Sequence, residues 1–288
     1  GYKNLLGYEE NGSDLTSGQA FYDLVIAAKP DNANNITISS INQWQTNDGG
    51  ATWYIVSHWT GDNGKPIIHS DFHEITYAPG TNNTIYSGSD GGIWRSTDNG
   101  VTWTDLSNNL NISQINKLGI SQTNPDLINA GMQDNGTNFK NASGWNNIFG
   151  GDGGESFIDH SNDDILYFCY TNSQIHRSDD GGVTENQITN GLPNGGPSGA
   201  DFYSSFHQDP VDANTIYAGG HVAMYKSTNK GDNWAAIGTP TGPGNITEFA
   251  IAPSNNQVIY VCKYDAISKS TDGGATFTDI SSGTPINF

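Results

Sequence analysis

Five short segments of this sequence decide its fold, because they are variants of one octapeptide, called here the box. They read TNDGGATW (46–53), STDNGVTW (96–103), SDDGGVTE (178–185), STNKGDNW (227–234) and STDGGATF (270–277). The acidic or amide residues of the five copies are Asp48, Asp98, Asp180, Asn229 and Asp272. Successive copies are 50, 82, 49 and 43 residues apart. Repeats of 20–50 residues are typical of solenoids, propellers and arrays. The interval of 82 residues is about two such periods, which indicates a further repeat, with a decayed box, between residues 108 and 150.

Each part of the box has a structural use. The Asp carboxylate can accept hydrogen bonds from backbone N–H groups two or three residues on, which closes an Asx-type turn. A glycine two positions after the Asp permits a positive φ. The following Thr and Trp start a strand, and the Trp can pack between neighbouring sheets. Because the five copies are so alike, we interpret their Asp and Asn side chains as hairpin staples rather than as one asymmetric active site.

The repeat around the second box reads as four short strands, at 73–78, 84–88, 92–96 and 101–106. Short strands with regularly spaced turn signals indicate antiparallel blades. We therefore predict an all-β fold, a β-propeller with six visible four-stranded antiparallel blades, in one domain over residues 1–288. The blades are expected at about 21–57, 70–107, 112–150, 155–190, 202–238 and 246–282.

The first residues raise a question about the number of blades. Tyr2–Gly7 resembles the fourth strand of a blade, as Trp145–Gly150 does, but its three partner strands do not precede it. The last blade already has a fourth strand at Ala275–Ile280. Tyr2–Gly7 either adds an outer strand to a six-bladed ring or belongs to a propeller of seven or more blades. We favour the larger propeller.

Composition restricts the partners. The chain has 30 acidic and only 11 basic residues, with a net charge of −19. Nucleic acids and anionic membranes require a basic surface, so neither is expected as a partner. Neutral glycans and cations fit this charge better. No apolar run reaches 18 residues, so no membrane span is predicted. Cys169 and Cys262 lie in repeats that are not neighbours, and we expect free thiols.

The box resembles the Asp-box, or bacterial neuraminidase repeat, which occurs in sialidases, sortilin-type receptors, photosystem assembly factors and xyloglucan-active glycoside hydrolases. Four further segments are most similar to sortilin-like and xyloglucanase-like propellers in secreted proteins of Bacteroidetes-type bacteria. They are HSDFHEI (69–75), GSDGGIW (88–94), GMQDNGT (131–137) and GGDGGE (150–155). The resemblance implies a propeller that is secreted or displayed on the cell surface. It specifies the fold rather than one activity.

Two enzyme families can be compared residue by residue. Sialidases hold their substrate carboxylate with three arginines, whereas this sequence has only Arg95 and Arg177. It is therefore not expected to be a sialidase. Ser89–Arg95 resembles the segment that carries a catalytic Asp in xyloglucanase-like enzymes, with Asp90 at the catalytic position. Compared with the segment of those enzymes, Ser89–Arg95 lacks one residue between the Asp and the glycine pair. Those enzymes also place their acid and base on two separate propellers, whereas one propeller is predicted here.

Candidate site residues gather in two sets of loops, which a propeller places on one face. They come from the loops that lead into each first strand and from the loops between second and third strands. The catalytic candidates are Asp90 and Asp152, as a general acid and base for glycoside hydrolysis. The expected ligand-binding residues are His69, Asp71, His73, Gln133, Asp134, Glu155, Asp201 and His221.

Two of these segments have alternative interpretations. The histidines of residues 69–73 are either metal ligands on one side of an extended strand or hydrogen-bonded residues at a polar strand start. Residues 150–155 either direct two acids toward the central channel or form a glycine-rich turn. A calcium ion is compatible with the loops of Asp90, Asp134 and Asp152, although their spacing is not that of an EF-hand. No other cofactor is expected.

The leading functional hypothesis is a secreted or cell-surface propeller that interacts with a glycan. Glycoside hydrolase activity is one form of this hypothesis, and the sequence leaves open whether the protein is an enzyme. Exposed aromatic side chains that could stack on sugar rings are Trp44, Trp59 and Trp94. The alternative is a non-catalytic adhesin or scaffold that mediates protein–protein contacts in a larger surface protein. The expected partner is therefore a glycan or another extracellular ligand, bound by part of a larger chain or surface assembly.

Overall fold

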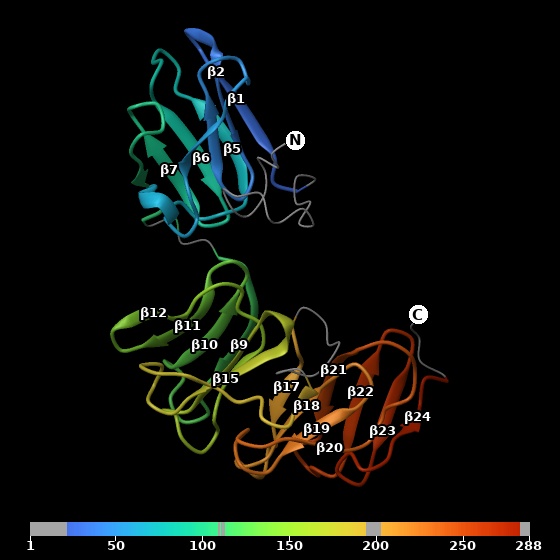
Figure 1. Ribbon diagram of the computed structural model, residues 1–288. Coiled ribbons are helices and arrows are strands. Elements are labelled where there is room, and N and C mark those ends of the chain that lie inside the picture. Colours follow the sequence, from blue (N-terminus) through green and yellow to red (C-terminus); the bar gives the residue numbers. More distant parts are fainter. Residues whose placement is uncertain (1–21, 109, 111–112, 194–202, 283–288) are drawn as a thin grey trace. The chain divides into compact units, whose positions relative to one another are not determined.

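The computed structural model describes residues 22–108, 110, 113–193 and 203–282 (Figure 1). The chain forms two compact units, which divide after residue 112. The strand predicted at Tyr2–Gly7 and the predicted site residue Asp201 lie outside the described residues.

The described part of the first unit contains two four-stranded antiparallel sheets with their strands in chain order. One consists of β1 (Val25–Lys29), β2 (Asn32–Ser39), β3 (Gln43–Thr46) and β4 (Tyr54–Ser57). The other consists of β5 (Phe72–Tyr77), β6 (Ile85–Ser89), β7 (Gly92–Ser96) and β8 (Thr104–Asp105), and a 3-10 turn, η2 (Asp62–Gly64), precedes it. The contact between them includes a buried polar pair. The buried amide of Gln43 donates a 2.7 Å hydrogen bond to Ser87 Oγ across the two sheets.

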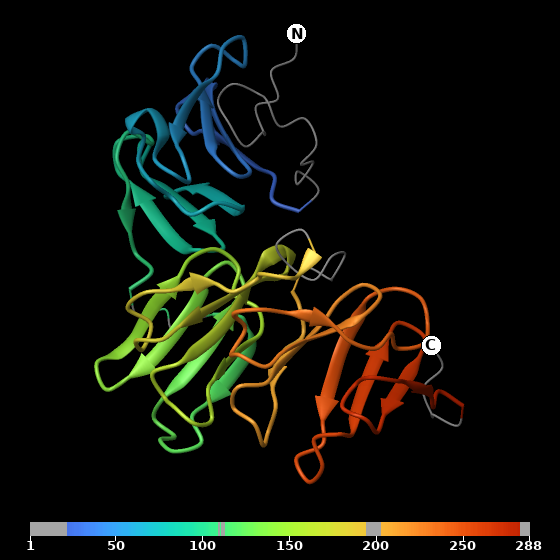
Figure 2. The ribbon, with the colours of Figure 1, turned by 60° about the horizontal axis from the view of Figure 1, so that its bottom comes forward.

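The described part of the second unit contains four sheets of the same kind (Figure 2). The first consists of β9 (Ile115–Ile120), β10 (Ile128–Met132), β11 (Gly136–Asn141) and β12 (Gly144–Phe149). The second consists of β13 (Ser156–Ile158), β14 (Leu166–Tyr170), β15 (Gln174–Ser178) and β16 (Asn186–Gln187), with a 3-10 turn, η3 (Thr171–Ser173). The third consists of β17 (Phe206–Gln208), β18 (Ile216–Gly219), β19 (Met224–Ser227) and β20 (Ala235–Ala236). The fourth consists of β21 (Ile246–Ile251), β22 (Ile259–Lys263), β23 (Ile267–Ser270) and β24 (Thr278–Asp279).

These six sheets confirm the predicted class, an all-β propeller fold of four-stranded antiparallel blades. Each predicted repeat gives one sheet. Apolar side chains fill the space between successive sheets of the second unit. One core joins the β13–β16 and β17–β20 sheets through residues such as Tyr167, Ile175, Phe206 and Trp234. Smaller cores lie on either side of it, one around Phe139, Ile158 and Leu166 and the other around Tyr217, Met224, Ile246, Phe249, Ile259 and Val261.

The five boxes share one pattern of hydrogen bonds, which the first box illustrates; the fourth box lacks only the last of these bonds, because Asn233 replaces the Thr. The Thr46 hydroxyl donates to Asp48 Oδ1 at 2.7 Å and accepts the N–H of Gly50 at 2.9 Å. Asp48 Oδ1 accepts the N–H of Thr52 at 2.9 Å, and Oδ2 accepts the Thr52 hydroxyl at 2.6 Å. The carboxylate therefore reaches four residues along the chain, one further than predicted, because the turn contains two successive residues with positive φ, Gly49 and Gly50. A bond to the residue three positions on, as predicted, is also present, for example from the Val183 N–H to Asp180 Oδ1 at 3.1 Å.

The box also fixes the blade at a second point. The residue after the box Asp or Asn donates its N–H to a carbonyl at or just before the start of the second strand of the same blade. In chain order, these acceptors are the carbonyls of Asn34, Asn83, Asp164, Asn214 and Gln257. The decayed repeat has a tight Asn141–Gly144 turn instead, and its fourth strand, β12, has six residues, whereas β8, β16, β20 and β24 have two each. The box therefore replaces part of the fourth strand with side-chain hydrogen bonds.

These hydrogen bonds predict how stability depends on pH. The hydroxyl of the box Thr, followed by its backbone N–H, lowers the pKa of Asp48, Asp180 and Asp272 from 3.8 to about 2. A depressed folded-state pKa gives stability that is present above the unfolded-state pKa and is lost as pH falls through the folded value. We expect the free energy of unfolding in urea to fall between pH 4 and pH 2, a window set by these pKa values.

The matched variant replaces these three aspartates with asparagine. Asn229 already occupies the fourth box, where its Oδ1 accepts from the Ser227 hydroxyl at 2.8 Å and from the Asn233 N–H at 3.0 Å. The triple variant should therefore keep the fold and show a flatter pH dependence in this window. An unchanged slope would show that other carboxylates cause the acid sensitivity.

Candidate functional site

The first strands of the sheets carry charged or polar residues at one repeated position. In the five described sheets that follow β1–β4, the residue after the first strand donates its N–H to the carbonyl of the residue just before the second strand. These donors are Ala78, Ser121, Asp159, Asp209 and Ala252. Four residues before these positions lie Glu74, Lys117, Glu155, Ser205 and Glu248. The last four come from the four different sheets of the second unit.

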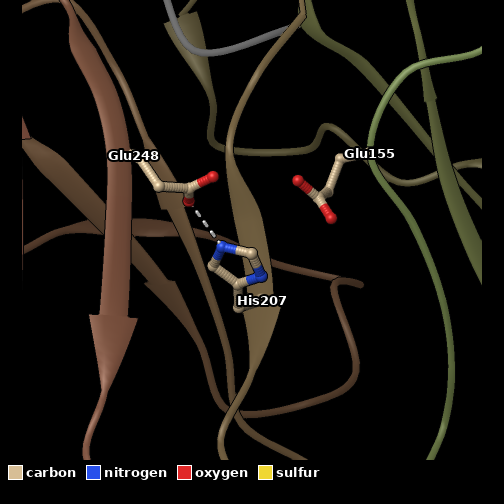
Figure 3. A group of neighbouring side chains, drawn as sticks. All are labelled: Glu155, His207 and Glu248. Atoms are coloured by element: carbon tan, nitrogen blue, oxygen red, sulfur yellow. Dashed lines mark hydrogen bonds and ion pairs between the residues drawn. The ribbon is translucent and has the colours of Figure 1, made fainter. Parts of the chain in front are cut away.

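Three of these side chains, those of Lys117, Glu155 and Glu248, meet His207 of β17 in what we call the Glu–His cluster. Figure 3 shows Glu155, His207 and Glu248. Lys117 Nζ lies 2.6 Å from Glu248 Oε2 and 3.4 Å from Glu155 Oε2. His207 Nε2 lies 2.8 Å from Glu248 Oε1, which also accepts a 2.6 Å hydrogen bond from the Ser205 hydroxyl. Figure 3 shows the two carboxylates on either side of the imidazole ring.

The two carboxylates have opposite environments. Burial raises the pKa of Glu155, and this effect outweighs the opposing charges of His207 and Lys117. Burial also acts to raise the pKa of Glu248, but hydrogen bonds from His207, Lys117 and Ser205 hold it well below its usual range. The same contacts raise the pKa of Lys117 in spite of its partial burial. The cluster thus combines a stable anion with a carboxyl group that takes up a proton more readily.

A second group of polar side chains, called here the amide network, lies beside this cluster. Gln133 Nε2 donates a 2.6 Å hydrogen bond to Asp152 Oδ1, which also accepts the N–H of Asp134 at 3.0 Å. The Tyr203 hydroxyl donates to Gln133 Oε1 at 2.7 Å and accepts from Asn116 Nδ2 at 3.1 Å. Burial, followed by the charge of Asp152, raises the pKa of Tyr203, so this phenol remains a hydrogen-bond donor. Asn116 adjoins Lys117 on β9, which places the two groups next to each other.

The glycine-rich turn at 150–155 connects the two groups. Gly153 donates its N–H to the carbonyl of Met132, and Gly154 donates to that of Cys169, at 2.9 and 3.0 Å. A Cβ on Gly153 would lie 2.7 Å from Gly131 Cα, and one on Gly154 would lie 2.7 Å from Cys169 Sγ. Only glycine fits at these close approaches. The turn directs Asp152 toward the amide network and Glu155 toward the Glu–His cluster. Residues 150–155 thus form the expected glycine-rich turn, and the direction of both acids toward a central channel stays a prediction.

In the first unit, the predicted residues of the 69–73 segment meet the loop of Asp90. His73 Nε2 lies 2.7 Å from Asp90 Oδ1, and the N–H of Asp90 donates to the carbonyl of Asp71 at 3.2 Å. The side chain of His69 packs against Gly91, where a Cβ would clash with it. These four residues therefore lie together in the structure, and their expected roles in ligand binding and catalysis stay predictions. The His73–Asp90 pair matches the interpretation as hydrogen-bonded histidines at a polar strand start.

The remaining predicted residues have separate environments. His221 contacts the side-chain oxygen of Asn245 through its Nδ1. Asp90 belongs to the first unit and Asp152 to the second, so their joint role as acid and base stays a prediction, as does calcium binding at the Asp90, Asp134 and Asp152 loops. Trp44 is only 6% exposed and belongs to the core, so its predicted availability for sugar stacking is wrong. Trp59 is 38% exposed. Both cysteines are free thiols, as predicted; burial raises the pKa of Cys169 to about 12.

Sequence reasoning missed Asn116, Lys117, Tyr203, His207 and Glu248. Three of them, Lys117, His207 and Glu248, join Glu155 in the Glu–His cluster. A signal for Lys117 and Glu248 was present, because both align with Glu155 at the repeated first-strand position. The other residues have no counterpart in the repeat and become visible only when the sheets pack together.

The sequence matches no protein-family model and no curated protein. Solved structures similar to the chain include the GH74 xyloglucanase of Xanthomonas campestris, with 15% identity and a TM-score of 0.44. That match covers 89% of this chain and 45% of the enzyme, so the chain spans about half of its length. Sqt1 from Chaetomium thermophilum has 15% identity and a TM-score of 0.44, covering 89% of this chain and 71% of Sqt1. The structure of YCF48 bound to D1 peptide has 13% identity to the chain and a TM-score of 0.39, and the match covers 87% of this chain and 93% of YCF48.

Among the described residues, no helix has the length and apolar character needed to cross a bilayer.

Proposed function

We propose that this protein is a secreted or cell-surface propeller that interacts with a glycan, and that the amide network of the second unit contacts the sugar. The observation that carries the proposal is the convergence of Asn116, Gln133, Asp152 and Tyr203 in one hydrogen-bonded, half-buried group. A few fixed polar groups of this kind orient a small ligand and give it specificity. Amides, carboxylates and a phenol suit the many hydroxyls of a neutral sugar, each of which donates and accepts hydrogen bonds.

Other features support the same proposal. The net charge of −19 disfavours anionic ligands, whereas a neutral glycan carries no such penalty. The box and the Ser89–Arg95 segment resemble those of Asp-box glycoside hydrolases. In the catalytic form of the proposal, Asp90 and Asp152 act as general acid and base, and the glycan is cleaved. In the non-catalytic form, the protein is an adhesin or scaffold that holds its ligand without turnover.

The test is a glycan array of neutral polysaccharides, with xyloglucan included because of the Ser89–Arg95 resemblance, followed by titration of the best ligand. We expect Gln133→Ala to weaken binding by about tenfold, because it removes hydrogen bonds to Asp152 and Tyr203 as well as to the ligand. Gln257→Ala is the matched control, because Gln257 is exposed near the box turn of its blade, at the other edge of the sheets. It should leave affinity unchanged.

Turnover is measured on the same ligand as release of reducing sugar. Release that Asp90→Asn or Asp152→Asn abolishes supports the hydrolase. Binding without release supports the adhesin or scaffold. Absence of binding to every glycan, or equal effects of Gln133→Ala and Gln257→Ala, would overturn the proposed function.

A further inference from the structure

We propose that Glu155, His207 and Glu248 form a site for a divalent transition-metal ion of the Zn²⁺ class, and that the Lys117 ammonium competes for it from within the chain. The site is separate from the amide network and does not depend on the proposed glycan function.

The donor set points to this class of ion. One carboxylate oxygen from each Glu and one imidazole nitrogen all lie within 4.8 Å of one another. They come from β17, from β21 and from the residue before β13, which belong to three different sheets (Figure 3). In a tetrahedral zinc site, bonds of about 2.1 Å place the ligand atoms about 3.4 Å apart, so the donor atoms must shift by up to about 1.4 Å to reach that geometry. Imidazole favours Zn²⁺, Ni²⁺ or Cu²⁺ over Ca²⁺ and Mg²⁺.

Glu155 supplies an independent reason to expect a cation. The residue is only 7% exposed, and its side chain is directed into the cluster (Figure 3). A buried carboxylate ordinarily accepts several hydrogen bonds. Within the described part of the chain, its carboxylate has one ion-pair partner, Lys117, at 3.4 Å, which exceeds the usual 2.7–2.9 Å for charged hydrogen bonds. Its negative charge is therefore incompletely compensated.

Lys117 marks where a positive charge is favourable. Its ammonium lies nearer Glu248, at 2.6 Å, than Glu155, and its side chain is 46% exposed. A long, exposed lysine can turn into solvent when another cation enters. Two carboxylates and one ammonium leave a net charge of −1 before any ion binds. Removal of the ammonium should therefore strengthen binding of a dication, because one competing positive charge is lost.

The experiment is calorimetric titration of tag-free, full-length protein with Zn²⁺, with Ca²⁺ as a parallel probe. We expect one Zn²⁺ per chain, affinity at least about tenfold higher in Lys117→Met than in the wild type, and much weaker Ca²⁺ binding. His207→Ala and Glu248→Gln should each reduce Zn²⁺ affinity more than tenfold. His221→Ala is the matched control, since it removes an exposed histidine outside the cluster.

The Lys117→Met protein decides the outcome even if a ligand variant fails to fold. Its folded state is verified by circular dichroism, and Zn²⁺ should raise its thermal unfolding temperature. Absence of stoichiometric Zn²⁺ binding by folded Lys117→Met would overturn the proposal. Zn²⁺ binding that survives in His207→Ala, or that His221→Ala removes, would also overturn it. Preference for Ca²⁺ over Zn²⁺ would contradict the assigned class of ion.

Discussion

Replacement of Trp234 with alanine is expected to lower the free energy of unfolding of the second unit by about 3–5 kcal/mol. The indole of this box residue is only 6% exposed and lies in the core between the β13–β16 and β17–β20 sheets. Its Nε1 donates a 2.7 Å hydrogen bond to the carbonyl of Ile188, and its backbone N–H donates to Asn190 at 2.9 Å. Alanine leaves a cavity and an unpaired buried carbonyl. Urea unfolding followed by circular dichroism measures the loss.

Trp145→Ala is the matched control for this prediction. Trp145 lies in the same unit on β12, but it is 51% exposed, so its replacement should change stability by no more than about 0.5 kcal/mol. Hydrogen exchange of peptides from β14–β19 should accelerate in Trp234→Ala and not in Trp145→Ala. Equal losses in both variants would show that the box tryptophan does not hold the two sheets together.

Lys230→Met should cost about 3 kcal/mol, because it leaves a buried carboxylate without its cation. Lys230 Nζ lies 2.9 Å from Asp159 Oδ2, and the Asp159 side chain is fully shielded from solvent. Asp159 belongs to the preceding sheet, where its other oxygen accepts the N–H and hydroxyl of Ser161. Burial acts to raise the pKa of Asp159, but Ser161 and Lys230 outweigh it and lower the pKa. The ion pair is therefore a polar bridge between two sheets.

The control is Lys140→Met, since Lys140 lies 3.9 Å from Asp126, which is 87% exposed. Surface ion pairs of this kind contribute about 0–1 kcal/mol. The Asp159→Asn/Lys230→Met double variant should recover much of the loss, because no uncompensated charge remains buried. If Lys230→Met is as mild as Lys140→Met in urea unfolding, the Asp159 carboxylate must reach solvent or another donor.

The sequence by itself determined the repeat and the blade. The boxes are local structures, because each closes through side chains and backbone groups within a few residues, as Thr46, Asp48 and Thr52 do. Strand order follows from the same repetition, since consecutive strands joined by tight turns pair as antiparallel neighbours. The strand expected at 101–106 is shorter in the structure, Thr104–Asp105, because the box occupies the preceding residues.

The candidate site could be predicted only in part. His73 and Asp90, and likewise Gln133 and Asp152, were expected on one face, because the loops that enter a first strand and those between second and third strands share one face of a propeller. The repeat aligns Lys117 with Glu248 but does not indicate that the two side chains pair, since they are 131 residues apart. The packing of sheets against one another decides which first-strand residues meet. That packing depends on apolar volumes such as those of Trp234 and Tyr167, so it is a property of the tertiary structure rather than of any single repeat.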